Sequence, residues 1–265
     1  RRLARQNHRA QHGATFLDAA GAVTTLRAPM HTQTVTIARR FNGPPGSGNG
    51  GYVCGLMAKE ITGASEAALR APPPLEAPLT LTRDEANIVR LHHGETLIGE
   101  AKPIAFTLEA PPASTLQQAR DAATRFAGRD DHRYPTCFVC GPGRPAHDGL
   151  DLFTGPVENS TLVACTWTPS ADLADANGIV RPEFIHAALD CPSYWAMPHA
   201  GKPALLARLA ASIDAPLPRA GEELIVAAWP LASSGRKHGG AAALYHADGV
   251  LIARAEALWI EPREA

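Results

Sequence analysis

Residues 49–58 read Asn-Gly-Gly-Tyr-Val-Cys-Gly-Leu-Met-Ala, and residues 181–190 read Arg-Pro-Glu-Phe-Ile-His-Ala-Ala-Leu-Asp. Each segment follows Gly, Pro or polar turn residues, continues as an apolar helical pattern and precedes a β-rich stretch. Only the second segment carries a carboxylate at its end, Asp190. The two segments therefore predict one helix in each half of the chain. They also suggest two half-sites that complement each other, one with glycines and one with an acid.

The last β-rich stretch of each half supports an internal duplication. Residues 97–104 read Leu-Ile-Gly-Glu-Ala-Lys-Pro-Ile and residues 251–258 read Leu-Ile-Ala-Arg-Ala-Glu-Ala-Leu. Each stretch follows a turn that contains glycine. Repeats of roughly 110 residues are too long for a solenoid, so they indicate two similar domains packed together.

The domain boundaries are expected where the composition changes. Residues 1–25 begin with basic residues and are weakly periodic, which is typical of a poorly ordered tail. We expect an N-terminal repeat at residues 26–112, a linker at 113–131 and a C-terminal repeat at 132–265. Residues 116–126 of the linker could form a short helix.

The hydrophobic patterns predict one helix and several strands in each repeat. In the N-terminal repeat we expect strands at 34–38, 86–92 and 96–108 and a helix at 52–61. In the C-terminal repeat we expect a helix at 182–197 and strands at 150–153, 160–168, 205–213, 222–232, 239–246 and 250–260. Pro192 is expected to kink or end the second helix, because proline lacks the N–H that continues the hydrogen-bond ladder.

The composition narrows the classes of function. With 265 residues, 45% of them hydrophobic, the chain has the length and the apolar content of a soluble globular protein. A net charge of −1 argues against nucleic-acid binding. No apolar run reaches the roughly 18 residues that cross a bilayer, and five cysteines do not look like a secreted disulfide framework. We expect a cytoplasmic protein without nucleic-acid or membrane partners, and a homo-oligomer stays open.

A helix that follows a Gly-Gly turn and precedes long antiparallel strands resembles the hotdog fold of acyl-CoA thioesterases and dehydratases. Residues 49–51 resemble the His-Gly-Gly that opens the hotdog helix in many thioesterases, with Asn in place of His. Residues 188–195, Ala-Leu-Asp-Cys-Pro-Ser-Tyr-Trp, resemble the Leu-Asp-His-x-x-Trp segment of the double-hotdog acyl-CoA thioesterase II family. Residues 137–143, followed by Gly-Leu at 149–150, resemble the Cys-x-x-Cys-Gly start of another thioesterase branch. The resemblance implies an α+β double hotdog, with two repeats that each wrap an antiparallel sheet around a central helix.

The same resemblance implies hydrolysis of an acyl-CoA thioester at one composite site between the repeats. The Asp of the thioesterase II family is catalytic, so Asp190 is the expected base or nucleophile. The amides of Gly50 and Gly51, at the positive end of the helix dipole, are expected to bind the oxyanion. Asn49 is expected to position water. The mirror-related site lacks an acid, because Ala58 occupies the corresponding position.

The sequence departs from the thioesterase II pattern at two positions. The Gln and Thr that hold the attacking water in that family fall on Ala257 and near Leu231. Ser233 and Ser234 are the expected substitutes, as substrate-binding residues, and Glu256 is a further candidate.

His186 and Tyr52 are further candidates for substrate binding. His186 precedes Asp190 by about one helical turn, so it can share the helix face of Asp190 and act as a base. Tyr52 directly follows the paired glycines. A histidine base would favour a hotdog dehydratase or hydratase. The missing Gln and Thr would favour a non-catalytic protein that binds acyl-CoA or another small ligand.

Cys137 and Cys140 have the spacing of metal ligands, and His132 and His147 lie near them in the sequence. One Cys-x-x-Cys pair is a weak signal, because a structural zinc site requires four ligands. We therefore expect a tight turn packed by two thiols. We expect no metal and no cofactor apart from the CoA portion of the substrate.

Overall fold

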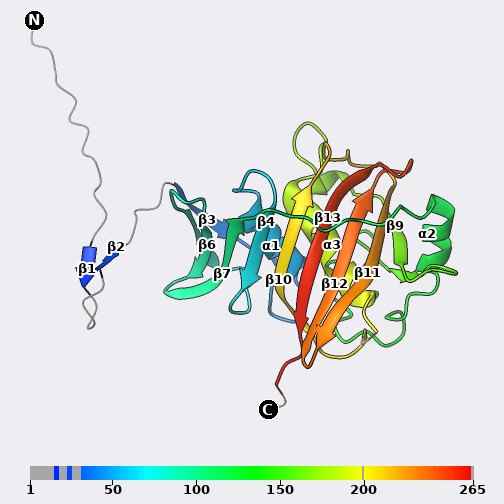
Figure 1. The fold of residues 1–265 in the computed structure, drawn as a ribbon, viewed down its shortest axis with the longest axis horizontal. Helices are drawn as coiled ribbons and strands as arrows, with labels where there is room; N and C mark the ends of the chain where they lie inside the picture. The colour runs from blue at the N-terminus through cyan, green and yellow to red at the C-terminus, as the bar shows by residue number, and fades with distance from the viewer. Residues whose placement is uncertain (1–14, 18–22, 26–30, 199, 264–265) are drawn as a thin grey trace, which may run out of the picture.

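The computed structural model describes residues 15–17, 23–25, 31–198 and 200–263. An antiparallel sheet of 11 strands dominates this part of the chain (Figure 1). The poorly ordered tail expected at residues 1–25 lies mostly outside the described residues. Within it, β1 (Thr15–Leu17) pairs antiparallel with β2 (Val23–Thr25).

The two halves of the chain present the same order of elements. The first half contains β3 (His31–Thr36), α1 (Gly50–Ala58), β4 (Ser65–Leu69), β5 (Pro78–Arg83), β6 (Val89–His93) and β7 (Thr96–Pro103). The second half contains β9 (Val163–Trp167), α3 (Pro182–Trp195), β10 (Leu205–Ile213), β11 (Leu224–Ser234), β12 (Lys237–Tyr245) and β13 (Leu251–Ile260). Short elements lie before or between these, namely η1 (Arg39–Phe41), α2 (Leu116–Ala123), β8 (Gly155–Pro156) and η2 (Ala171–Leu173). None of the helices in the described residues is long and apolar enough to span a membrane.

The strand order is β3-β5-β6-β7-β4-β10-β13-β12-β11-β9-β8. The two halves join where β4 pairs antiparallel with β10, in the register of Ala67 with Leu209. Outward from this junction, β4, β7, β6, β5 and β3 correspond one by one to β10, β13, β12, β11 and β9. The described chain is therefore an α+β structure in which one continuous sheet extends across both halves.

Helices α1 and α3 lie side by side and run antiparallel. Two glycines of α1 allow their backbones to come close together. A Cβ on Gly51 would lie 2.4 Å from the Cβ of Asp190, and a Cβ on Gly55 would lie 2.6 Å from the Cα of Glu183. Gly51 contacts Asp190, and the later Gly55 contacts the earlier Glu183, so the two helices run in opposite directions. Gly51 and Gly55 are one turn apart, so they form one glycine face. This face brings the start of α1 against the later part of α3.

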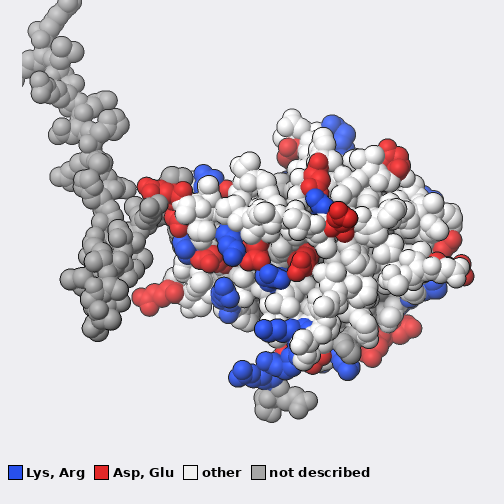
Figure 2. Space-filling model, viewed as in Figure 1, with Lys and Arg blue, Asp and Glu red and all other residues white. Residues whose placement is uncertain are grey.

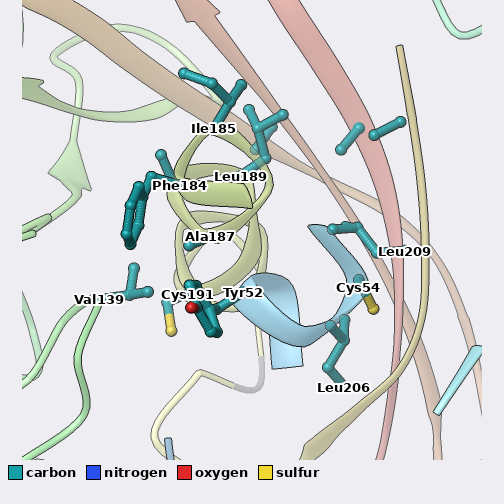
Figure 3. Close-up of a cluster of buried hydrophobic side chains, with 14 of the residues drawn as sticks. Tyr52, Cys54, Val139, Phe184, Ile185, Ala187, Leu189, Cys191, Leu206 and Leu209 are labelled. Carbon is teal, nitrogen blue, oxygen red and sulfur yellow. The ribbon is translucent and has the colours of Figure 1, made fainter. Parts of the chain in front are cut away.

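The core surrounds the two helices. Every residue of α1 after Gly50 is buried, which is typical of a helix that is apolar on all sides. In Figure 3, the side chains of Phe184, Ile185 and Leu189 project from α3 into the apolar cluster. Tyr52 lies where α1 meets α3 in the same view. Both helices are thus fixed by packing, and their relative position sets the geometry of any site between them.

Of the two outcomes expected at Pro192, a kink or an end of the helix, the end does not occur. Helix α3 continues to Trp195, and the N–H of Ala196 donates to the carbonyl of Pro192. The hydroxyl of Ser193 donates to the carbonyl of Asp190 at 2.6 Å and accepts the indole N–H of Trp259 at 2.9 Å. The bond from Trp259 anchors the last turn of α3 to β13.

The other elements compare with the expectations in three ways. No strand forms at 150–153, because Asp151 has a φ of 54°, a left-handed conformation that interrupts an extended strand. Strand β4 was not anticipated, since Ser-Glu-Ala-Ala-Leu has weak strand propensity, and it forms by pairing on both sides with β7 and β10. The short helix considered for residues 116–126 of the linker forms as α2, whose Ala119 and Ala122 are buried in a small cluster with residues of β9 and β11.

Candidate active site

Asp190 is the buried centre of the site, with 1% of its surface exposed. Its Oδ2 accepts two hydrogen bonds from the start of α1. The Nδ2 of Asn49 donates at 2.8 Å and the backbone N–H of Gly51 donates at 2.9 Å. Its Oδ1 is buried and has no hydrogen-bond partner among the described residues. One carboxylate oxygen is thus held in place while the other is left for a further partner.

The environment of Asp190 shifts its pKa. Burial raises the pKa of this carboxyl from the ordinary 3.8 to about 7, although the hydrogen bonds from Gly51 and Asn49 oppose the shift. Negative charge on Cys137 adds to the rise. A carboxyl group with this pKa exchanges a proton near neutral pH, which is the property required of a general base.

Asn49 fixes the start of α1 and also orients Asp190. Asn49 is the N-cap of α1, and its Oδ1 accepts the backbone N–H of Tyr52 at 2.9 Å. Its Nδ2 remains to donate to Asp190. The next residue, Gly50, is the first residue of the helix, and its N–H makes no hydrogen bond with the described residues. Gly50 therefore offers a backbone donor at the positive end of the helix dipole.

A cavity of about 550 Å³ opens beside these groups. Asn49, Gly50 and Asp190 line it, whereas Gly51 does not. Its walls consist mainly of the loop before α1, residues 69–73, residues 132–140, the end of α3 with the start of β10, and residues 259–262. Apolar residues such as Leu206 form much of the wall. The carboxyl group and the amide of Gly50 thus face a space large enough for a small ligand.

Basic side chains surround the cavity. Arg70, Arg133, Lys202 and Arg236 contribute to its lining and are exposed. Figure 2 shows several Lys and Arg side chains at the lower end of the molecule, near the point where β13 ends. The cavity combines an apolar interior with cations at its edge.

Three cysteines lie beside Asp190. The Sγ atoms of Cys137, Cys140 and Cys191 all lie within 4.8 Å of one another. All three residues are buried and line the same cavity. The Nε2 of His132 lies 3.2 Å from the Sγ of Cys140. The thiols of Cys140 and Cys191 lower the pKa of Cys137 well below its ordinary value by hydrogen bonding to its sulfur.

The structure brings together only part of the expected site. Asn49, Gly50, Gly51 and Asp190 meet, but Gly51 does not offer its N–H to a ligand because that N–H is bonded to Asp190. Gly51 and Asp190 are thus in direct contact, with no space for a thioester between them. Glycine is required at position 51 because the two helices are in close contact there.

The four expected substrate-binding residues do not line the cavity. Ser233 and Ser234 are exposed at the end of β11, next to the turn into β12. The ring of Tyr52 stacks on Phe41, with centroids 4.5 Å apart, inside an aromatic cluster. The Nδ1 of His186 lies 3.0 Å from the carbonyl of Pro182, and burial lowers the pKa of His186.

Sequence reasoning missed Gly55 and Cys191. Gly55 is four residues after Gly51, so the helical spacing of the two glycines was a usable signal for a helix contact. Cys191 is 51 positions after Cys140 in the chain, and only the fold brings it to the pair. His147, which lies near the cysteine pair in the sequence, is exposed and is not part of the cysteine cluster.

The glycine contact predicts a loss of stability on substitution. Gly51→Ala should lower the free energy of unfolding by about 1–3 kcal/mol, because its Cβ would overlap the Cβ of Asp190 in a packed core. Gly143→Ala is the matched control, since its Cβ would meet the carbonyl oxygen of Pro135 at 3.1 Å in an exposed turn. Thermal melts of both variants test this. Equal melting temperatures would mean that the helices can separate without cost.

No protein-family model and no curated protein matches this sequence. Solved structures do match over most of the chain. A candidate thioesterase II from Thermobifida fusca is 16% identical with a TM-score of 0.57, covering 89% of this chain and 94% of that one. The tesB protein of Mycobacterium avium subspecies paratuberculosis is 11% identical with a TM-score of 0.56, covering 87% and 93%.

A third solved structure carries the name of the fold. It is a conserved protein of unknown function with a hot dog fold from Alicyclobacillus acidocaldarius, 12% identical with a TM-score of 0.58, covering 95% of this chain and 97% of that one. At these identities, the likeness establishes the fold. The chain has the α+β hotdog fold of this structure and of the thioesterase structures.

Proposed function

We propose that this protein hydrolyses an acyl-CoA thioester at one composite site. The main support is the buried carboxyl group of Asp190. It accepts hydrogen bonds from Asn49 and Gly51 across the helix contact and faces a cavity. Asp190 comes from the second half, while Asn49 and the N–H of Gly50 come from the first. The thioesterases with the same fold add weight to hydrolysis as the reaction class.

Asp190 and Gly50 have different roles in the proposed reaction. The Asp190 carboxylate takes a proton from a water molecule, whose oxygen bonds to the carbonyl carbon of the thioester. The carbonyl oxygen becomes an oxyanion and accepts the N–H of Gly50, reinforced by the α1 dipole. When the C–S bond breaks, the Asp190 carboxyl returns its proton to the sulfur. The products are a carboxylic acid and the free thiol of CoA.

The cavity fits the chemistry of an acyl-CoA. Its apolar wall, including Leu206 and Trp259, suits an acyl chain. Arg70, Arg133 and Lys202 at the exposed edge suit the phosphates of CoA, because guanidinium and ammonium groups bind phosphate oxygens. We place the acyl chain inside and the nucleotide at this edge.

The proposal includes an internal duplication, with hotdog repeats at residues 26–112 and 132–265. The identical order of elements and the matching strand order on both sides of the β4–β10 junction favour it. Divergence of the repeats would explain why only one of them contributes an acid.

A direct assay tests the function. Purified protein is mixed with a panel of acyl-CoAs that differ in chain length, and free thiol is followed with a chromogenic disulfide. We expect catalytic turnover on at least one chain length. A protein that binds acyl-CoA in calorimetry but releases no thiol from any member would be a binding protein and would contradict the proposal.

The pKa of Asp190 predicts the pH profile of that activity. Because burial raises this pKa to about 7, the carboxylate form dominates above that pH and the neutral acid below it. If the carboxylate is the base, kcat/KM should rise as the pH increases from about 5 to about 7 and then level off. Rates measured across this range on one acyl-CoA test it. A profile that falls through pH 7 would point to a protonated acid instead.

A further inference from the structure

The cysteine cluster has the geometry of a metal site. The Sγ atoms of Cys137 and Cys191 lie 3.7 Å apart, and Cys140 completes a triangle in which no pair exceeds 4.8 Å. A tetrahedral Zn²⁺ with Zn–S bonds of about 2.3 Å places its sulfur ligands about 3.8 Å apart. Three thiols from distant parts of the chain thus lie close to the spacing that one ion requires.

The local chain holds two of the sulfurs in place. The N–H of Gly141 donates to the carbonyl of Cys137, and the N–H of Cys137 donates to the carbonyl of Tyr134. A Cβ at Gly141 would lie 2.5 Å from the N of Cys137, so this tight turn accepts only glycine. The turn therefore directs Cys137 and Cys140 to one side.

The third sulfur comes from α3. Cys191 directly follows Asp190 in the helix. In Figure 3 its sulfur lies on the side of α3 near the segment that carries Val139. The cluster thus connects the segment after the linker to the helix that carries the proposed base.

His132 supports the cluster from outside it. The Nδ1 of His132 accepts the backbone N–H of Tyr134 at 3.0 Å, so the proton of the neutral ring lies on Nε2. The Nε2–H then donates to the sulfur of Cys140 at 3.2 Å. Such a hydrogen bond stabilises a thiolate ligand from the second coordination shell. The histidine is a donor in this arrangement and not a fourth ligand.

A fourth position is available on the cavity side. All three cysteines and Asp190 line the same cavity, and the Sγ of Cys191 lies 4.0 Å from the Oδ2 of Asp190. The buried Oδ1 of Asp190 has no hydrogen-bond partner among the described residues. Oxygen or sulfur ligands from the cavity can therefore reach an ion held by the thiols.

We propose that Cys137, Cys140 and Cys191 bind one thiophilic divalent cation, of which Zn²⁺ is the probe, with a fourth position open to the cavity. Thiol protons are released as the thiolates bind the ion, and no oxidation or reduction is involved. The site revises the expectation of two thiols that merely pack a turn. It does not rest on the proposed hydrolysis, because the evidence for it is the arrangement of the ligands alone.

Metal binding tests the site without reference to activity. The full-length protein is stripped with a chelator under reducing conditions, titrated with Zn²⁺, and analysed for bound metal by mass spectrometry after gel filtration. We expect one Zn²⁺ per chain. With Co²⁺ instead, strong sulfur-to-cobalt charge-transfer absorption should appear, and it should change when a small thiol such as 2-mercaptoethanol enters the fourth position.

Matched variants locate the ligands. Cys137→Ala, Cys140→Ala and Cys191→Ala should each lose stoichiometric binding, whereas Cys165→Ala, another buried free cysteine, should retain it. Circular dichroism of the metal-free proteins shows that each variant is folded before it is compared. His132→Gln should keep one ion but bind it roughly 10- to 100-fold more weakly.

Three results would overturn the proposal. The first is a wild-type protein that binds no Zn²⁺ while its thiols are reduced. The second is a native disulfide between Cys137 and Cys191, detected by peptide mass mapping without reduction. The third is a His132→Gln variant that binds no metal, because His132 would then be a ligand and the open fourth position would be wrong.

Discussion

Asp190→Asn should reduce kcat/KM for thioester hydrolysis by roughly 100- to 10,000-fold, the usual cost of losing a general base. The substituted side chain is nearly isosteric. Its amide oxygen can still accept the N–H of Gly51 and the Nδ2 of Asn49, so the helix contact should remain. Only the capacity to take a proton is lost. Thiol release on the best acyl-CoA substrate measures the effect.

The same variant should be more stable than the wild type at alkaline pH. The pKa of Asp190 in the folded protein, about 7, is raised above its ordinary 3.8. The group therefore contributes stability below about pH 4, and that contribution is lost as the pH rises to about 7. The difference between these two pKa values corresponds to about 4 kcal/mol in the free energy of unfolding. Asparagine does not ionise, so at about pH 8 Asp190→Asn should have a higher melting temperature than the wild type.

The combination of effects distinguishes catalysis from structure. Asp130→Asn is the control, since it makes the same chemical change at an exposed position. We expect it to alter neither rate nor melting temperature. If Asp190→Asn keeps full activity, the proposed base is wrong. If it loses activity together with stability at all pH values, Asp190 holds the helices together and need not act on water.

The sequence predicted that Asp190 and the start of α1 lie near each other, but it did not predict their direct hydrogen bonds. Both groups belong to short helical segments, and an apolar helix with glycines needs a closely packed partner. The sequence could not predict which amide faces the cavity. Adjacent helical residues point about 100° apart, so the roles of Gly50 and Gly51 depend on the rotation of α1 against α3. That rotation is set by the packing of Gly51 and Gly55.

The positions of the two serines and of Cys191 were also hard to predict, because they too depend on tertiary packing. The position of Ser233 and Ser234 depends on the length of β11 and on an irregular pairing between Pro230 and Ser233. The pattern of apolar residues does not show such a shift. Cys191 and the pair at 137 and 140 are brought together only when α3 packs against the segment after the linker.

Gly50→Pro should lower kcat by roughly 100- to 1,000-fold, because it removes the one N–H assigned to the oxyanion. Proline is well tolerated at the first position of a helix, where the N–H has no partner within the helix. The preceding residue, Asn49, has a ψ of 132°, which is the extended conformation that proline requires before it. The variant should therefore fold, and a melt comparable to that of its control would show this.

Gly50→Ala is that control, since it keeps the N–H and adds a Cβ against the same Leu206 side chain. Each variant is compared in kcat and in KM, and the difference between them isolates the hydrogen bond. Equal activities would remove the amide from the mechanism. The second half of the chain already carries the proposed change, because α3 begins with Pro182 and Ala58 stands where α3 has Asp190. A loss of activity in Gly50→Pro would thus support the proposal that the mirror-related position, which lacks both the donor and the acid, does not form a second site.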